Sequence, residues 1–217
     1  MNIRRIKRLK KRFRETRVLT AVFIIIMIAI FIVNLVISTQ CNRFWVALSG
    51  GGYLTEYLQL AKDALYENRQ FYRLITYGFL QTSIIHLLAN IIALWYIGGL
   101  FEESIGRLRF LLILAIGLII PGILLLVIYP NAHIYGASPA IYACIGILVN
   151  WAFRRKELWQ YLRRQKGYRF VAGYFVLGNI PGICTLVFHL LGFIAGLLLG
   201  FVISDELEEN RRIVGGL

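Results

Sequence analysis

One segment, Leu19–Ile37, limits the possible folds of this chain more than any other. Its 19 residues form an apolar run that one amide, Asn34, interrupts. A run of about 20 apolar residues is long enough to cross the hydrocarbon core of a bilayer as an α-helix. Hydrophobic residues make up 59% of the 217 and charged residues only 16%, which is too apolar for a soluble domain. The sequence therefore predicts an all-α polytopic membrane protein, since it lacks the alternating segments of about ten residues that mark an outer-membrane barrel.

Five further segments are apolar enough to be membrane spans, so we predict a six-transmembrane-helix bundle within residues 18–204. A basic tail, 1–17, precedes this bundle and a short tail, 205–217, follows it. The first span is too long for a typical signal peptide and no small-residue cleavage site follows it, which favours an uncleaved anchor. The connection Ser38–Thr82 is rich in aromatic residues, and we expect it to be partly helical and to lie on the membrane. The predicted spans are Leu19–Ile37, Ser83–Phe101, Phe110–Tyr129, Ser138–Phe153, Phe170–Ile180 and Gly182–Ser204.

The net charge of +13 would suit a nucleic-acid partner, but the distribution of the basic residues argues against one. Twenty of the 24 Lys and Arg residues lie in the two tails and in two loops on the same side of a six-span topology. The other four lie in the long first loop. Because basic segments stay in the cytoplasm, we predict a multi-pass cell-membrane protein with cytoplasmic N- and C-termini. Its surroundings are the lipid bilayer, and the second, fourth and sixth spans begin at the outer face.

The three cysteines, Cys41, Cys144 and Cys184, show no metal-binding or redox spacing. Cys144 lies within an apolar segment, where we expect a small core residue. Cys41 and Cys184 fall on the same predicted side of the membrane, which leaves a disulfide between them open. No metal site and no cofactor are predicted.

Ser138 lies where an uncharged loop meets the fourth predicted span. Gly136 allows a tight turn before it, and Pro139 fits the first position of a helix. Ser138 is therefore predicted to be the N-cap of that helix, with an exposed hydroxyl. A serine at such a junction is most often only a cap, so a functional interpretation needs a base and an oxyanion pocket at the same depth.

Two of the three histidines lie in apolar spans, where ionisable side chains are costly and usually face an interior or a wet cavity. His189 is followed at three and seven residues by Gly192 and Gly196, which share its helix face. Such glycines let a neighbouring helix approach closely, and the fourth span is the candidate neighbour. His86 and Asn90 lie one turn apart, and both can donate hydrogen bonds to one point, as an oxyanion pocket requires. The structural alternatives are small-residue packing and an interhelical polar contact.

Tyr142 follows Ser138 by one helical turn and can pack against the ring of His189, although a tyrosine of the interfacial belt is an alternative. Taken together, these motifs resemble the rhomboid family of intramembrane serine proteases. The similarity covers roughly Phe71 to Phe201. The residues that carry it are His86 and Asn90 as H-x-x-x-N, Gly136 and Ser138 as G-x-S with Tyr142, and His189, Gly192 and Gly196 as H-x-x-G-x-x-x-G, with Tyr72-Arg73, Gly98-Gly99-Leu100-Phe101-Glu102 and Gly106 as secondary marks.

The resemblance implies a dyad without a carboxylate, in which Ser138 is the nucleophile and His189 the general base. His86, Asn90 and the backbone N–H of Ser138 would bind the oxyanion, and Tyr142 would support the ring of His189. The substrates would be transmembrane segments of other proteins, cleaved near the outer face in a hydrophilic cavity. No metal takes part in this chemistry.

The sequence departs from the family pattern at Pro139, where the family usually has glycine. Because the other donors are intact, we expect activity to survive with an altered substrate preference. The resemblance gives Arg73 and Glu102 structural roles. The alternative function is a catalytically inactive rhomboid-like protein that binds transmembrane clients. A transporter is disfavoured because we find no inverted repeat, and His133 is a rival base expected to be solvated. The sequence indicates no oligomeric state.

Overall fold

The computed structural model describes residues 17–41, 45, 51–81, 83–154, 156–164, 166–180 and 182–215. Apart from Arg17, the predicted basic tail lies outside these residues. The described residues are helical, with one isolated bridge between Leu60 and Ile134. The α-helices are α2 (Val18–Gln40), α4 (Thr55–Leu58), α5 (Arg73–Thr76), α6 (Ile84–Ile105), α7 (Arg107–Ile128), α8 (Ser138–Arg154), α9 (Lys156–Arg164), α10 (Lys166–Leu177) and α11 (Ile183–Gly215), with a π-helix at Asp63–Glu67 and a 3₁₀ turn at Tyr77–Phe79.

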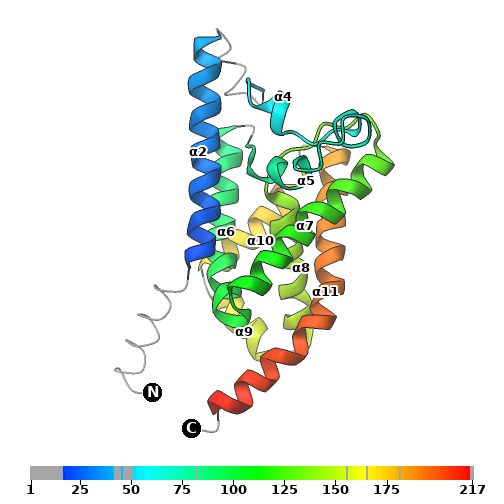
Figure 1. The fold of residues 1–217 in the computed structure, drawn as a ribbon. Coiled ribbons are helices and arrows are strands. Elements are labelled where there is room, and N and C mark those ends of the chain that lie inside the picture. The colour runs from blue at the N-terminus through cyan, green and yellow to red at the C-terminus, as the bar shows by residue number, and fades with distance from the viewer. Residues whose placement is uncertain are drawn as a thin grey trace.

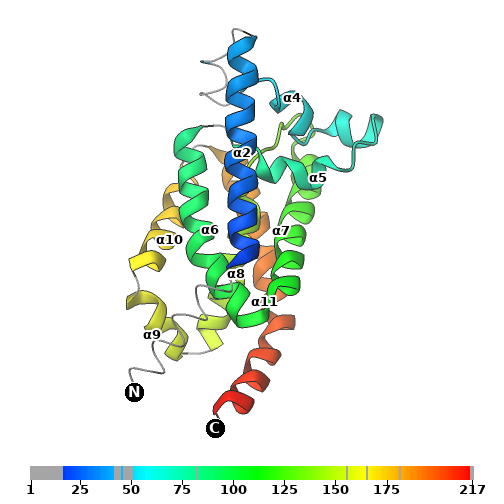
Figure 2. The same cartoon turned by 60° about the vertical axis from the view of Figure 1, so that its left-hand side comes forward.

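The long helices stand side by side as a bundle, with α2 next to α6 at one side (Figure 1). The segments α4 and α5 lie at the opposite end of the bundle from the C-terminal end of α11, as both views show (Figures 1 and 2). Within the described part of the chain, four helices are long and apolar enough to cross a membrane: α2, α6, α7 and the part of α11 up to Ile203. The predicted all-α membrane fold is therefore confirmed.

The helices α8 and α10 are shorter, with 17 and 12 residues, so the count of six spans stays a prediction. The position of α8 explains its composition. Every residue from Ser138 to Leu148 is buried, because α6, α7, α9 and α11 all pack against it. A helix enclosed on all sides needs no apolar outer surface, and small residues let its neighbours approach.

Glycines bring the backbones of α8 and α11 into contact, and this is the most extensive helix pair in the described part of the chain. A Cβ at Gly192 would overlap the carbonyl of Pro139, and one at Gly196 would overlap the carbonyl of Ala143. In the reverse direction, a Cβ at Gly146 would overlap the backbone of α11. The predicted close approach of the last span to the fourth is therefore confirmed.

The side chain of Glu102 joins α2 to α6. It is buried, and it accepts hydrogen bonds from the backbone N–H groups of Leu19 and Thr20 and, at 2.6 Å, from the Thr20 hydroxyl. The first N–H groups of a helix have no intrahelical partner, and their partial positive charge favours an anion. Glu102 thus caps α2 from 82 residues away in sequence, and Arg107 neutralises it in part at 3.8 Å.

Replacing Glu102 with Gln should lower the free energy of unfolding by about 1–3 kcal/mol, because the buried cap loses its charge but keeps its size. Thermal unfolding of the purified protein in detergent would measure the change. Glu67→Gln is the matched control. Glu67 is exposed, so this substitution should change the free energy of unfolding by less than about 0.5 kcal/mol. Equal shifts in the two variants would contradict the capping role.

The first loop is held against α2 by the polar groups of that helix. Asn34 donates to the carbonyl of Gly51 at 3.1 Å and accepts from the N–H of Leu54 at 2.8 Å. Ser38 accepts from the N–H of Tyr53 at 2.9 Å. The short helices of this loop agree with the partly helical structure that we predict for it. All three cysteines are free thiols, so the disulfide left open by the sequence is absent.

Candidate active site

Ser138 is the first residue of α8, and the loop before it turns at Gly136. The carbonyl of Ala137 accepts the first helical hydrogen bond, from the N–H of Ile141 at 3.2 Å. The cap position is therefore Ala137, one residue earlier than predicted, and Pro139 occupies the second helical position. Gly136 has a φ of 107°, a backbone conformation that side chains other than glycine rarely adopt.

The ring of His86 lies beside this loop. A Cβ at Gly136 would lie 2.8 Å from Cε1 of His86 and 3.7 Å from the Oγ of Ser138. The absence of a side chain at Gly136 therefore lets the imidazole sit next to the serine hydroxyl. The structure brings together these two predicted site residues, which come from α6 and α8.

The ring of His189 stacks on the ring of Tyr142, with a centroid distance of 4.1 Å and an interplanar angle of 16°. The Tyr142 hydroxyl donates to the carbonyl of Phe175 at 2.9 Å, which fixes the ring from the side of α10. The described structure thus gathers His86, Ser138, Tyr142 and His189 around the start of α8.

Asn90 lies one turn below His86 and is fully buried. Its amide nitrogen donates to Gln81 at 2.6 Å, and its oxygen accepts from the hydroxyl of Tyr174 at 2.6 Å. Its described partners are therefore Gln81 and Tyr174 rather than Ser138. Because an amide nitrogen carries two hydrogens, one donor is left for another acceptor.

Asn179 is a site residue that the sequence analysis did not identify. Its Oδ1 lies 3.0 Å from Nδ1 of His189, and its Nδ2 donates to the carbonyl of Phe175 at 2.5 Å and to the Tyr142 hydroxyl at 3.2 Å. It lies in the turn after α10, where no local motif distinguishes it from an ordinary turn asparagine. Gly178 before it and Pro181 and Gly182 after it are typical of a turn, but they do not single out the asparagine.

These contacts determine the tautomer of His189. A carbonyl can only accept, so the side of Asn179 that faces Phe175 must be the amide nitrogen. The oxygen of Asn179 then faces Nδ1 of His189, which must carry the proton. The other ring nitrogen, Nε2, is left as an acceptor, and an acceptor is what a general base for a hydroxyl requires.

The two predicted catalytic side chains are largely buried: Ser138 and His189 are only 4% and 5% exposed. The hydrophilic cavity open to the outer face that we expect from the sequence stays a prediction.

Comparisons with known proteins support the family resemblance. A family model for the Rhomboid domain matches residues 68–206, a range that includes every predicted site residue. "RHOMBOID-like protein 7" of Arabidopsis thaliana is 31% identical over 166 residues, which cover 70% of this chain and 50% of that protein. "Rhomboid protease GlpG" of Yersinia pestis (strain Pestoides F) is 25% identical over 190 residues, which cover 84% of this chain and 62% of that protein. The chain thus matches between half and two thirds of the length of these relatives.

Proposed function

Because this chain belongs to the rhomboid family, we propose that it is an intramembrane serine endopeptidase that cleaves transmembrane segments of other proteins. The name of the Yersinia relative, a rhomboid protease, supports this activity. In the proposed mechanism Ser138 is the nucleophile and His189 is the general base. His86, Asn90 and the N–H of Ser138 bind the oxyanion.

The observation that carries the proposal is that Ser138 and His189 lie at the same height on two neighbouring helices, α8 and α11, whose backbones are in contact. Tyr142, one turn after Ser138, stacks on His189. Gly192, one turn after His189, packs against the carbonyl of Pro139, the neighbour of Ser138. Two contacts therefore fix the height and the rotation of each helix relative to the other.

The proposed catalytic steps follow from the tautomer of His189, in which Nδ1 carries the proton and Nε2 is free to accept one. Nε2 of His189 accepts the proton of Ser138 as Oγ attacks the carbonyl carbon of the scissile peptide, because a serine hydroxyl is a weak nucleophile until a base removes its proton. The negative oxygen of the tetrahedral intermediate receives hydrogen bonds from His86, Asn90 and the N–H of Ser138. His189 then protonates the leaving amine, and water hydrolyses the acyl-enzyme by the same steps.

Asn179 acts as a positioning residue in this mechanism. Asn179→Ala should lower kcat by about 10- to 100-fold with a small change in KM, because the imidazole loses the partner that orients it. Steady-state cleavage of a transmembrane substrate in detergent would give both constants. Asn131→Ala is the control, since Asn131 is exposed in the loop before α8 and should leave both constants unchanged. A change in KM alone would contradict the positioning role.

Pro139 favours the alternative, an inactive protein that binds transmembrane clients. The first N–H groups of a helix have no intrahelical partner, so proline there removes no helical hydrogen bond. It does remove one backbone donor next to Ser138. The two functions differ in whether Ser138 is activated, which a fluorophosphonate probe can detect because it reacts only with an activated serine.

We expect the probe to label the purified parent protein on Ser138. Ser138→Ala should show no labelling and His189→Ala should show strongly reduced labelling. His133→Ala is the matched control, because His133 is an exposed loop residue and its loss should leave labelling unchanged. An unlabelled parent with an intact fold would support the inactive client-binding protein instead.

A further inference from the structure

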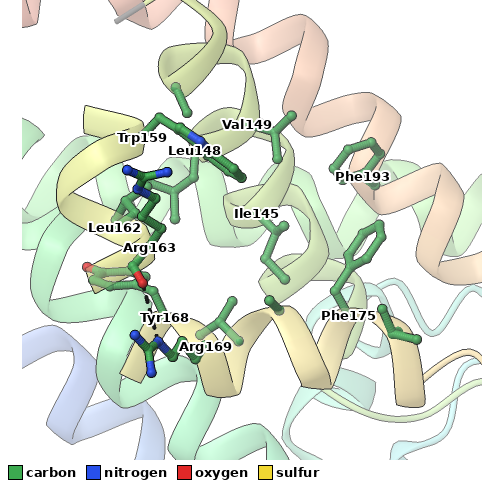
Figure 3. Close-up of a pocket in the computed structure, with 14 residues that line it drawn as sticks. Ile145, Leu148, Val149, Trp159, Leu162, Arg163, Tyr168, Arg169, Phe175 and Phe193 are labelled. Atoms are coloured by element: carbon green, nitrogen blue, oxygen red, sulfur yellow. Dashed lines mark hydrogen bonds between the residues drawn. The ribbon is translucent and has the colours of Figure 1, made fainter. Parts of the chain in front are cut away.

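A cavity of about 430 Å³ lies on the side of the bundle where α8, α9, α10 and α11 meet (Figure 3). Its wall is apolar and comes from all four helices: Ile145 and Leu148 of α8, Leu162 of α9, Phe175 of α10 and Phe193 of α11. The volume is within the range of about 300–1,000 Å³ that is typical of small-molecule sites. The proposed catalytic groups do not line it, so the cavity is separate from the candidate active site.

Two arginines stand at the edge of this apolar cavity, together with Trp159 (Figure 3). Arg169 donates from Nε to the carbonyl of Arg163 at 3.3 Å, which holds its guanidinium beside α9. Both arginines are exposed. Residues 154–169 contain seven basic residues and one acidic residue, Glu157, so the segment that carries these two arginines is strongly positive.

The position of the cavity along α8 indicates which leaflet of the bilayer it faces. It lies along Ile145 to Ala152, in the C-terminal half of α8, whereas Ser138 begins that helix. The exposed Trp159 and the arginines lie beyond this half, and such residues are typical of the boundary between the hydrocarbon core and the headgroups. The cavity is therefore at the depth of acyl chains in the leaflet opposite Ser138.

We propose that this cavity binds an acyl chain of an anionic phospholipid from that leaflet, with the headgroup phosphate held by Arg163 and Arg169. The apolar wall suits the chain, and basic pockets between membrane helices suit anionic headgroups. A free phosphate would leave the apolar cavity unused. A transmembrane helix, about 10 Å wide with its side chains, is too large to fit within a cavity of about 430 Å³.

The test is native mass spectrometry of the full-length protein with phosphatidylglycerol and phosphatidylcholine of identical acyl chains. The parent should retain one phosphatidylglycerol in preference to phosphatidylcholine. Arg163→Gln combined with Arg169→Gln should weaken this retention by about 10- to 30-fold, since each basic residue near an anionic lipid contributes several-fold. Arg211→Gln with Arg212→Gln removes the same charge elsewhere and should leave retention unchanged. Equal losses in the two double variants, or equal retention of the two lipids, would overturn the proposal.

A second pair of variants tests the acyl chain without changing charge. Ala172→Trp places a large ring at the cavity wall and should reduce retention of phosphatidylglycerol at least as much as the arginine variant does. Val202→Trp adds the same ring at an exposed position of α11 and should have no effect.

A phosphatidylglycerol with a photoreactive acyl chain should crosslink to α8 and α10. Crosslinks outside the residues that line the cavity would show that the acyl chain binds elsewhere, and displacement of the lipid by a transmembrane substrate peptide would show a different occupant; either result would overturn the proposal. Binding is measured without catalysis, so the result is independent of the proposed protease activity.

Discussion

Ser138→Ala should reduce the cleavage of a transmembrane substrate to background, a loss on the order of 10⁴-fold or more. The variant removes the atom that we propose forms the acyl-enzyme, and an oxyanion site without its nucleophile retains little activity. Because alanine differs from serine only by the loss of the hydroxyl oxygen, the fold should survive. A gel assay of a fluorescent model substrate, reconstituted with the purified protein in liposomes, measures the loss directly.

Ser104→Ala is the matched control for this experiment. Ser104 is near the C-terminal end of α6, whereas His86, which lies beside Ser138, is near its N-terminal end. The same chemical change at Ser104 should therefore leave the rate of cleavage unaltered. Cleavage by Ser138→Ala at the parental rate would exclude the proposed mechanism, whatever the result for Ser104→Ala.

Gly196→Ala should destabilise the bundle by about 3 kcal/mol, the largest effect on stability that we expect from the addition of one methyl group. The new Cβ would overlap the backbone of Ala143, and backbone atoms cannot move aside as a flexible side chain can. The two helices would have to separate, with loss of packing along the whole pair. For a chain of this size the midpoint of thermal unfolding in detergent should fall by about 6–12 °C.

Gly173→Ala makes the same substitution in α10, where a Cβ would meet no atom within 4 Å. Alanine favours a helix over glycine by about 0.5–1 kcal/mol, so this variant should unfold at a slightly higher temperature than the parent. The two substitutions thus have opposite expected signs. A fall of the same size in both would show that the loss does not come from the contact between α8 and α11.

The sequence predicts those parts of the site that depend on helical periodicity. Tyr142 follows Ser138 by one turn and Gly192 follows His189 by one turn, so their faces could be assigned before any contact was known. The glycine spacing after His189 also indicated a close neighbour. These inferences succeed because a regular helix converts a separation along the chain into a direction in space.

The remaining features depend on contacts that no local pattern encodes. Glu102 caps a helix that begins 84 residues earlier, and Asn179 approaches His189 only because the turn after α10 folds back. The hydrogen bonds of Asn90 to Gln81 and Tyr174 depend in the same way on tertiary packing. The predicted start of the fourth span, Ser138, is the first residue of α8. Only the cap differs from the prediction, because serine is the commoner cap, whereas here the carbonyl of Ala137 accepts the first helical hydrogen bond.

The backbone contact between α8 and α11 has a consequence for inactivation by heat. The proposed nucleophile and its base lie on two helices with no side chain between them at the glycine positions. Loosening of side chains elsewhere in the bundle leaves the spacing of this pair unchanged, so the two groups part only when the helices themselves come apart. Loss of catalysis on warming should then coincide with loss of native structure, with no folded but inactive form at intermediate temperatures.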